Sequence, residues 1–509
     1  MPVGGLHPPD ALGVIMLLPS EHVLASLAVE FNRLRSQLTD GEASALQSIG
    51  AGLALLIHRE HGDVPKVREQ IARLIGALNA AVALLPADSS SRHAAQSITV
   101  SLEQASRLDN LRDMEMAWRE DLQATETFSR QLAAETRLDA TVRTRIGLSM
   151  NAWEIGDLQA PLQNTASSPR ESAVSTEITA AALCAYLRER FSDPSIEVPM
   201  FRPLAGGFGK QTSLFDVTGQ KFSGAYVIRR DSAKPLVDND CHHIDVEYSL
   251  IRALHERGFP SPDALWVDTE HALLPGGNFL IMRRTPGTAG GTIFTASGKV
   301  PRDLMQTLAG ILARLHALPP MPALSNLTDS LNGALWNGPL DECVRRYIGG
   351  FRALFEREVH LPSAALPALF GWLLDNVPPM HGRPVLLHGD IGFHNFLFDD
   401  GKLTAVLDWE FAHLGDPAED LAYASNTLGT ALDTSAFLLE YKKAGGVDVD
   451  AKRLRFFKVW GQVRNACAAN LAAAKLASGR ADDLKLALLA HVYIPQFLGA
   501  AMKTIEAPA

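Results

Sequence analysis

One short stretch, residues 388–410, constrains the fold of this chain more than any other. An apolar segment ends near Asp390, Asn395 follows five residues later, and Asp408 comes at the end of a later apolar segment. The turn Asp399-Asp400-Gly401 lies between two apolar segments and predicts a β-hairpin. Three oxygen-bearing side chains are therefore expected together at one end of the hairpin.

This set of side chains suits a magnesium ion held on the phosphates of a nucleotide. Mg²⁺ takes one or two protein carboxylates and keeps its other positions for phosphate oxygens and water. A carboxylate that does not bind the metal can orient a substrate hydroxyl and take its proton. We assign the role of base to Asp390 and the role of metal ligands to Asn395 and Asp408. An isolated aspartate is usually a loop cap or a solvated residue, but the joint spacing favours the catalytic interpretation.

Three segments carry a resemblance to a known family. His388-Gly-Asp-x-x-x-x-Asn395, followed by Leu407-Asp-Trp-Glu410, resembles the signature of the aminoglycoside phosphotransferase family, small-molecule kinases that share the protein-kinase fold. Gly415-Asp-Pro-Ala-Glu-Asp420 resembles the segment that follows the metal-binding aspartate in that family. The resemblance covers residues 195–500, approximately.

The resemblance implies an α+β fold of the bilobal protein-kinase-like type, with a β-rich N-lobe and a helical C-lobe. It also implies ATP and Mg²⁺ as cofactors and a small-molecule hydroxyl as acceptor. Asp416 and Asp420 are expected to brace the catalytic loop by hydrogen bonds. His388 is expected to pack and brace the same loop, and not to act as an acid or base.

A phosphate-covering hairpin is expected upstream, in the N-lobe. The resemblance places it at residues 204–212, and the expected nucleotide-binding residues there are Gly206, Gly207, Gly209, Lys210 and Thr212. Glycines allow backbone N–H groups to approach phosphates closely. A glycine-rich hairpin is by itself more often only a turn, but this one lies between β-type segments where the family has its phosphate-covering hairpin.

A strand cation and an acidic partner complete the expected nucleotide site. Arg229, in the strand 226–230, stands where kinases usually have lysine, and a guanidinium can bind phosphate oxygens in bidentate fashion. Glu247 lies on a predicted helix where the family has the carboxylate that pairs with this cation. Arg229, Arg230 and Lys210 are all candidates for the main phosphate contact.

The hinge between the lobes is expected at Met282, whose backbone would meet the adenine edge. The family often has glutamate directly after this methionine, whereas this chain has Arg283. The departures at Arg229 and Arg283 support an alternative, a catalytically silent kinase-fold protein that binds nucleotide. The intact set of Asp390, Asn395 and Asp408 favours an active enzyme, because a binding module does not need the base.

The part before the kinase-like region has helical periodicity. Its apolar stripes consist of Leu46, Ile49, Leu53 and Leu56, and of Val67, Ile71, Leu74, Leu78, Val82 and Leu85. We predict an all-helical domain over 1–160, a polar linker over 161–176, a kinase-like N-lobe over 177–284 and a helical C-lobe over 285–509. The helical domain is interpreted either as a docking module or as a module that forms a homodimer.

Two further segments are predicted to carry no site. Asp240-Cys-His-His-Ile-Asp245 contains metal-ligand residue types, but adjacent residues rarely supply a complete tetrahedral set. The alanine-rich run from Asn465 to Ala477 is predicted to be a buried helix without chemistry.

Composition limits the partners. The chain has 47 basic and 57 acidic residues and a net charge of −10, which argues against nucleic acid because phosphate-backbone binding needs a clustered basic surface. The four cysteines lie far apart without a Cys-x-x-Cys pair, as suits a reducing cytoplasm. No apolar run approaches the roughly 20 residues that cross a bilayer, and no export signal is recognisable. We therefore expect a cytoplasmic protein without a membrane span.

The expected function is transfer of the γ-phosphoryl group of ATP to a hydroxyl of a small molecule. Residues 301–509 contain 22 acidic and 19 basic residues, without the acidic surplus that a polycationic aminoglycoside would favour. The Gly206-Gly207 segment and the Arg229-Arg230 pair resemble phosphotransferases associated with acyl-CoA metabolism. A hydroxyacyl-CoA is thus the expected acceptor, and the alternative is an aminoglycoside or another small alcohol.

Overall fold

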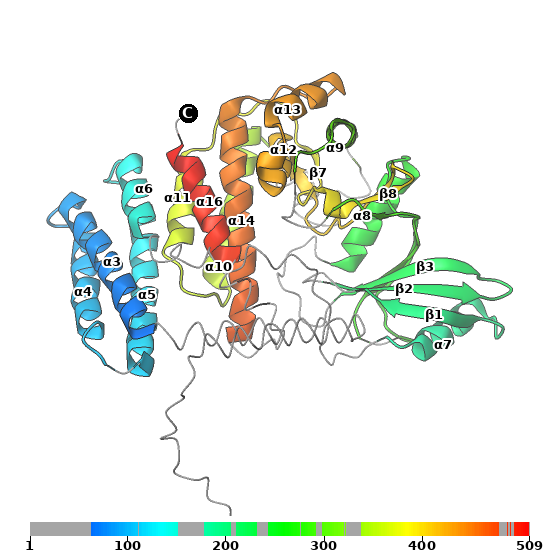
Figure 1. The fold of residues 1–509 in the computed structure, drawn as a ribbon, viewed down its shortest axis with the longest axis horizontal. Helices are drawn as coiled ribbons and strands as arrows, with labels where there is room; N and C mark the ends of the chain where they lie inside the picture. Colours follow the sequence, from blue (N-terminus) through cyan, green and yellow to red (C-terminus); the bar gives the residue numbers. More distant parts are fainter. Residues whose placement is uncertain are drawn as a thin grey trace, which may run out of the picture.

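The computed structural model describes most of the chain from residue 63 onward. The described residues are 63–109, 111–150, 178–204, 210–231, 243–274, 276–291, 298–319, 321, 337–477, 486, 489 and 493–507. A helical unit lies at one end of the molecule, an antiparallel sheet lies at the other, and a helical lobe lies between them (Figure 1). The C-terminal helical lobe therefore lies between the N-terminal helical unit and the sheet.

The helical unit contains α3 (Asp63–Leu84), α4 (Ser90–Ala105), α5 (Leu111–Ala134) and α6 (Ala140–Ser149). Two of these helices begin at side-chain caps, Ser89 before α4 and Asp139 before α6. The predicted stripe from Val67 to Leu85 lies in or against its core, so the helical prediction is confirmed for this part. The stripe at 46–56 and the linker at 161–176 lie outside the described residues, and the domain boundaries stay predictions.

The N-lobe is a five-stranded antiparallel sheet with a helix on each face. Its strands are β1 (Glu197–Pro203), β2 (Lys210–Thr218), β3 (Gly224–Asp231), β4 (Ala264–Asp268) and β5 (Phe279–Arg283), in the order β1-β2-β3-β5-β4. The helices are α7 (Ala180–Phe191) and α8 (Ile244–Glu256). This is the predicted β-rich lobe.

Residues of β3 alternate between the two faces of this sheet. Tyr226 and Ile228 pack into the core that contains α7. Val227 packs with Ile244 of α8 on the opposite face. Arg229 consequently lies on the α8 face of the sheet.

The strand predicted over 226–230 is part of β3, and the helix predicted to carry Glu247 is α8. The sequence did not predict β1 and β4, which are the two edge strands. β1 contains Pro199 and Pro203, and proline removes a backbone donor and is confined to sheet edges. β4 has only five residues and an irregular register against β5 between Ala264 and Trp266. Both strands therefore lack a clear strand pattern.

The helical C-lobe surrounds a few short strands. Its helices are α9 (Arg302–His316), α10 (Leu340–Arg357), α11 (Ala365–Asp375), α12 (Ala418–Leu428), α13 (Thr434–Lys443), α14 (Ala451–Ala477), α16 (Ile494–Glu506) and the short η3 (Phe393–Asn395) and η4 (Gly429–Ala431). Its strands are β7 (Val385–Leu387), β8 (Phe396–Asp399), β9 (Lys402–Val406) and β10 (His413–Gly415), with β6 (Thr288–Ala289) paired to β8. The predicted hairpin is confirmed, and its turn residues Asp400 and Gly401 have positive φ.

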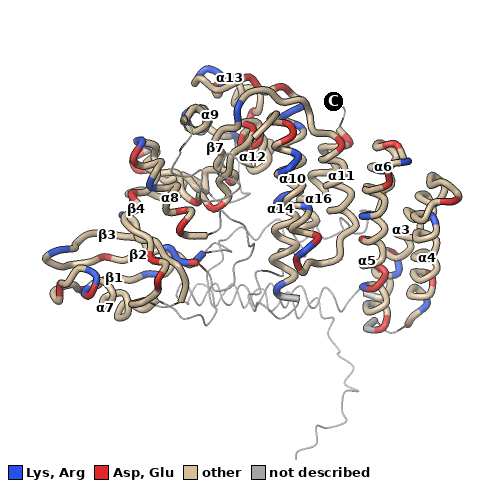
Figure 2. Tube along the Cα trace, turned by 180° about the vertical axis from the view of Figure 1, so that it is seen from behind, with Lys and Arg blue, Asp and Glu red and all other residues tan. Residues whose placement is uncertain are grey.

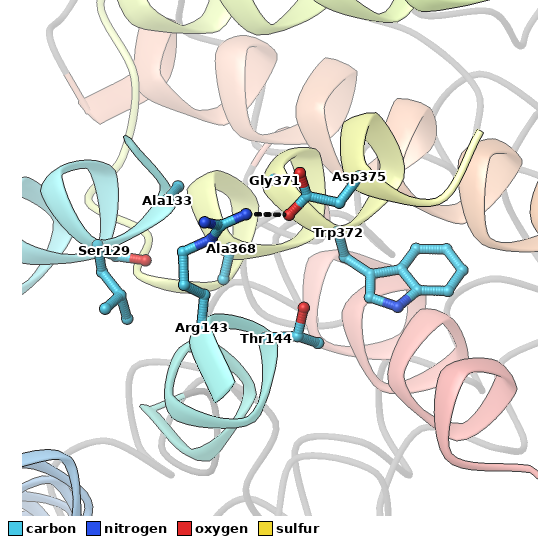
Figure 3. Close-up of a pocket in the computed structure, with 9 residues that line it drawn as sticks. Ser129, Ala133, Arg143, Thr144, Ala368, Gly371, Trp372 and Asp375 are labelled. Atoms are coloured by element: carbon cyan, nitrogen blue, oxygen red, sulfur yellow. Dashed lines mark hydrogen bonds and ion pairs between the residues drawn. The ribbon is translucent and has the colours of Figure 1, made fainter. Parts of the chain in front are cut away.

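The helical unit packs on the C-lobe through α5, α6 and α11. Ser129 of α5 donates a hydrogen bond to the carbonyl of Ala364 (2.7 Å), and Arg143 of α6 forms an ion pair with Asp375 of α11 (2.7 Å). Figure 3 shows this ion pair beside the close approach of α6 to α11. A side chain at Gly147 would collide with Ala368, so α6 and α11 are nearly in backbone contact. This surface of α5 and α6 is therefore covered by α11 within the chain.

Charged residues of both signs are interspersed over all three parts of the described chain (Figure 2). None of the described helices combines the length and the apolar character needed to span a bilayer.

Candidate active site

The catalytic loop follows β7, and its first residue, His388, is fully buried. Its Nε2 faces the carbonyl oxygen of Leu407 at 2.9 Å, and its Nδ1 faces the N–H of Asp390 at 3.2 Å. Because a carbonyl only accepts and an amide only donates, the neutral ring with its proton on Nε2 satisfies both contacts. Burial lowers the pKa of His388, which also favours the neutral ring. The prediction that His388 braces the loop is confirmed.

Asp420 holds the loop from the opposite side. It accepts the N–H groups of His388 and Gly389, each at 2.9 Å, and lies 3.2 Å from His316 Nε2. Gly389 has φ +80°, and a side chain there would collide with the carbonyl oxygen of Phe411. Only glycine therefore fits this position.

Asp416 braces two helices and not the catalytic loop. It accepts the N–H of Ala418 at 2.8 Å and a bidentate contact from Arg453 at 2.6 and 2.5 Å. These contacts join the start of α12 to the start of α14. The predicted hydrogen bonds to the catalytic loop are therefore present for Asp420, whereas those of Asp416 reach α12 and α14.

Asp390 and Asn395 are in direct contact. Asn395 Nδ2 donates to the backbone carbonyl of Asp390 (2.9 Å) and lies 3.3 Å from its carboxylate, so the amide oxygen is the atom left for a cation. His394 Nε2 lies 3.7 Å from the same carboxylate. Burial opposes ionisation of Asp390, but contacts with His394 and Tyr423 outweigh it and hold its pKa below the usual value. Asp390 is thus a carboxylate at neutral pH, as a base must be.

Asp408 lies at the same end of the hairpin. The N–H of the preceding residue, Leu407, donates to the carbonyl of Asn395 (2.7 Å). Asp408 has φ +64°, a conformation that aspartate adopts more readily than most residues. The three predicted oxygen donors are therefore brought together, and their chemistry, a carboxylate plus an amide oxygen beside a second carboxylate, fits Mg²⁺.

Arg229 joins the N-lobe to this group. Its Nη2 lies 2.5 Å from Asp408 and 3.5 Å from Glu410, and its Nε lies 3.1 Å from Glu247 of α8. The predicted pairing of Arg229 with Glu247 is therefore present in the structure. Burial raises the pKa of both Glu247 and Asp408, and the adjacent guanidinium favours their ionised forms.

Strand pairing separates the three candidate phosphate-binding cations. Thr212 and Lys210 of β2 lie opposite Arg229 and Asp231 of β3, so all four share the α8 face. Lys210 Nζ lies 2.5 Å from Asp231. Arg230 lies on the other face, where it donates to Gln211 Oε1 at 2.6 Å.

Met282 of β5 is buried on the α8 face, next to Val227. The following Arg283 points instead to Asp263, with its Nε 3.0 Å from that carboxylate. The hairpin glycines Gly206, Gly207 and Gly209, and residues 240–242 of the histidine-containing segment, lie outside the described residues.

Comparison with known proteins identifies the family. Residues 201–457, half of the chain, match the model of the phosphotransferase enzyme family, APH. The chain belongs to this family. Its residues 201–457 thus form a domain of the phosphotransferase enzyme family.

Curated relatives of this phosphotransferase include acyl-CoA dehydrogenase family member 11 of Gallus gallus, 32% identical over 213 residues, which are 40% of this chain and 26% of the relative. The protein of the same name from Homo sapiens is 26% identical over 261 residues, 48% of this chain and 30% of the relative. The phosphotransferase therefore spans only about a quarter to a third of these relatives.

Solved structures similar to this phosphotransferase include a macrolide 2'-phosphotransferase from Brachybacterium faecium, with 20% identity and a TM-score of 0.39 over 64% of this chain and 98% of that one. Another is a spectinomycin phosphotransferase in complex with ADP and spectinomycin. It has 16% identity and a TM-score of 0.42 over 65% of this chain and 99% of that one.

Sequence reasoning missed several residues that contact the catalytic loop of this phosphotransferase. Arg464 of α14 is buried and donates to the carbonyl of Gly389, and Tyr423 of α12 lies near Asp390 and helps to lower the pKa of its carboxyl group. The helix predicted over Asn465 to Ala477 is confirmed as part of α14, which begins earlier, at Ala451, and therefore also contains Arg464. A single arginine beside an alanine-rich helical run was the signal that could have pointed to it.

Proposed function

We propose that this phosphotransferase transfers the γ-phosphoryl group of ATP to a hydroxyl of a small molecule, with Asp390 as the base. The observation that carries the proposal is the position of Asp390, whose carboxylate is partly exposed and held in contact with Asn395. A carboxylate in that position can orient an acceptor hydroxyl and take its proton as the phosphoryl group arrives. Catalysis then depends mainly on positioning and on neutralisation of charge.

The residues that would hold Mg²⁺ are Asn395 and Asp408. When bound, the ion neutralises phosphate charge and orients the phosphates for in-line transfer. Arg229 is the cation best placed for the main phosphate contact, because it shares a sheet face with Thr212 and already lies at Asp408. Glu247 orients this guanidinium from α8.

The acceptor that we propose is a hydroxyacyl-CoA. The relatives named as acyl-CoA dehydrogenase family members support an acceptor drawn from acyl-CoA chemistry. The near balance of acidic and basic residues in the C-lobe, 22 against 19 over residues 301–509, gives no support to a polycationic acceptor.

A screen of ATP consumption tests this proposal. Hydroxyacyl-CoAs, aminoglycosides, choline-like amino alcohols and sugars are offered separately with Mg-ATP, and phosphorylated product is measured for each. We expect turnover with hydroxyacyl-CoAs. Turnover with another class alone would reject the acceptor but keep the phosphotransferase, whereas nucleotide binding without turnover on any class would support the silent alternative.

A further inference from the structure

Arg464 is a buried cation that sits behind the catalytic loop. It is 1% exposed, and its Nη2 donates to the carbonyl oxygen of Gly389, the residue before Asp390. Its Nη1 lies 3.4 Å from Glu419, and its guanidinium carbon lies 5.1 Å from the ring centre of Tyr423 and 5.3 Å from that of Phe411. Burial of a guanidinium is costly unless it is paired and hydrogen-bonded. Its contacts are directed at the loop that carries the base.

Gly389 is bonded at both of its backbone polar groups. Its N–H donates to Asp420 at 2.9 Å, and its carbonyl accepts from Arg464. Its φ of +80° makes the chain turn sharply just before Asp390. The Gly389 carbonyl belongs to the peptide group that joins Gly389 to Asp390, and the N–H of that group donates to His388 Nδ1, so Arg464 and His388 together set its orientation and therefore the direction of the Asp390 side chain.

Helices α12 and α14 also meet beside Asp390. Tyr423 of α12 lies close enough to Asp390 to lower the pKa of its carboxyl group, and Asn465, next to Arg464, lies 3.5 Å from the Tyr423 hydroxyl through its Nδ2. Arg464 thus lies over the ring of a tyrosine that neighbours the base.

We propose that Arg464 is a positioning residue for phosphoryl transfer, holding the Gly389–Asp390 peptide so that the carboxylate of Asp390 is directed at the acceptor hydroxyl. The inference rests on the proposed function, because it assigns Arg464 to the orientation of the base named there. A small misdirection of a base lowers turnover strongly without weakening nucleotide binding. Arg464 acts through Asp390 and has no contact of its own with substrate in this proposal.

The kinetic test compares three variants. Arg464→Met removes the charge and the donors at similar volume, and Arg464→Lys keeps one charged donor. Arg455→Met is the matched control, because Arg455 lies on the same helix but donates to the carbonyls of Thr504 and Ile505, at 3.0 and 2.6 Å. We expect Arg464→Met to lower kcat by about 10- to 100-fold with the KM for ATP changed by less than about twofold. Arg464→Lys should recover much of that loss, and Arg455→Met should keep the wild-type kcat.

A second measurement does not depend on the acceptor. Amide hydrogen exchange reports the bonds from the N–H groups of His388 and Gly389 to Asp420. Arg464→Met should accelerate exchange in this loop, and Arg455→Met should not. If the wild-type protein turns over no acceptor but Arg464→Met still accelerates exchange in this loop, the proposed function is rejected and the brace is kept.

The proposal is overturned if Arg464→Met retains wild-type kcat and wild-type loop exchange. It is also overturned if Arg464→Met and Arg455→Met lose kcat equally, because that result indicates general destabilisation of α14. If Arg464→Met does not fold, Arg464→Lys is used in its place. A positioning role predicts that Arg464→Lys has a kcat below that of the wild type at an unchanged KM for ATP.

Discussion

Nη2 of Arg229 and the carboxylate of Asp408 lie 2.5 Å apart, although 179 residues separate them in the sequence. The contact joins β3 of the N-lobe to the segment after β9 in the C-lobe. Glu247 holds the other edge of the same guanidinium at 3.1 Å. Arg229 thus pairs with Asp408, the proposed metal ligand in the C-lobe, and with Glu247, the buried carboxylate on α8 of the N-lobe.

Replacement of this cation is expected to destabilise the protein. Arg229→Met leaves Glu247, which is 1% exposed, without its cation, and breaking a buried ion pair in this way costs about 3 kcal/mol or more of unfolding free energy. Denaturant unfolding measures the loss. Arg252→Met is the control on the facing helix, because the pair of Arg252 with Glu256 is exposed and should contribute little to stability. Equal losses in the two variants would contradict the assigned role of Arg229.

The base assignment predicts a separation of binding from turnover. Asp390→Ala should retain Mg-ATP binding and lose about 100-fold or more in kcat, because the acceptor proton then has no positioned base. Calorimetry of nucleotide binding and a steady-state assay check the two halves. Asp400→Asn in the β8–β9 turn is the control, since asparagine tolerates its φ of +46°. Wild-type turnover in Asp390→Ala would refute the assignment.

Two glycines with positive φ should respond differently to alanine. Gly389→Ala places a side chain against the carbonyl oxygen of Phe411, whereas Gly401→Ala, with φ +74°, meets no atom within 4 Å. Gly401→Ala should cost only about 1–2 kcal/mol of backbone strain. Gly389→Ala should cost more and should abolish turnover, as thermal unfolding and a kinetic assay would show. A Gly389→Ala variant as stable and active as Gly401→Ala would be inconsistent with the loop geometry.

The contact between the helical unit and the C-lobe should depend on pH. His360 Nδ1 lies 2.7 Å from the carbonyl of Glu358, and its Nε2 lies 2.8 Å from the Glu126 carboxylate, so each nitrogen has an acceptor beside it, although Nε2 also lies 3.1 Å from the donor Arg130 Nη2. The doubly protonated ring satisfies both, and the bond to Glu126 raises the pKa of His360 although the nearby Arg130 opposes this. Burial raises the pKa of Glu126, but its bonds to His360 and Ser363 outweigh this and lower it.

A histidine whose pKa is raised by folding stabilises the folded state at pH values below its ordinary pKa. This stabilisation is lost as the pH rises through the pKa of the folded state. A glutamate whose pKa is lowered by folding stabilises the folded state at pH values above its ordinary pKa. This stabilisation is lost as the pH falls through the pKa of the folded state. The contact should therefore be strongest between about pH 4.3 and about pH 6.5 and should weaken above that window. Thermal unfolding from about pH 6 to about pH 8 measures this, and His360→Gln should flatten the dependence. An unchanged slope in His360→Gln, compared with the exposed-site control His255→Gln, would count against the contact.

Local patterns in the sequence were sufficient to predict the residues at the core of the site. Asp390, Asn395 and Asp408 lie within one loop and one hairpin, so their spacing along the chain already determines that they meet. Alternation along β3 likewise places Arg229 and Arg230 on opposite faces. The choice between these two cations, however, required the position of α8, because alternation does not say which face is the functional one.

Contacts across long separations were decided only by the tertiary structure. Arg464 lies 75 residues from Gly389, and Glu126 lies 237 residues from Ser363, so no periodicity or motif relates either pair. A helical stripe indicates that a face is buried but does not specify what covers it. The sequence by itself determined the chemical groups of the loop and their order, whereas the packing of α14 and α5 decided which distant side chains hold that loop and the C-lobe, because such contacts depend on the relative placement of whole elements.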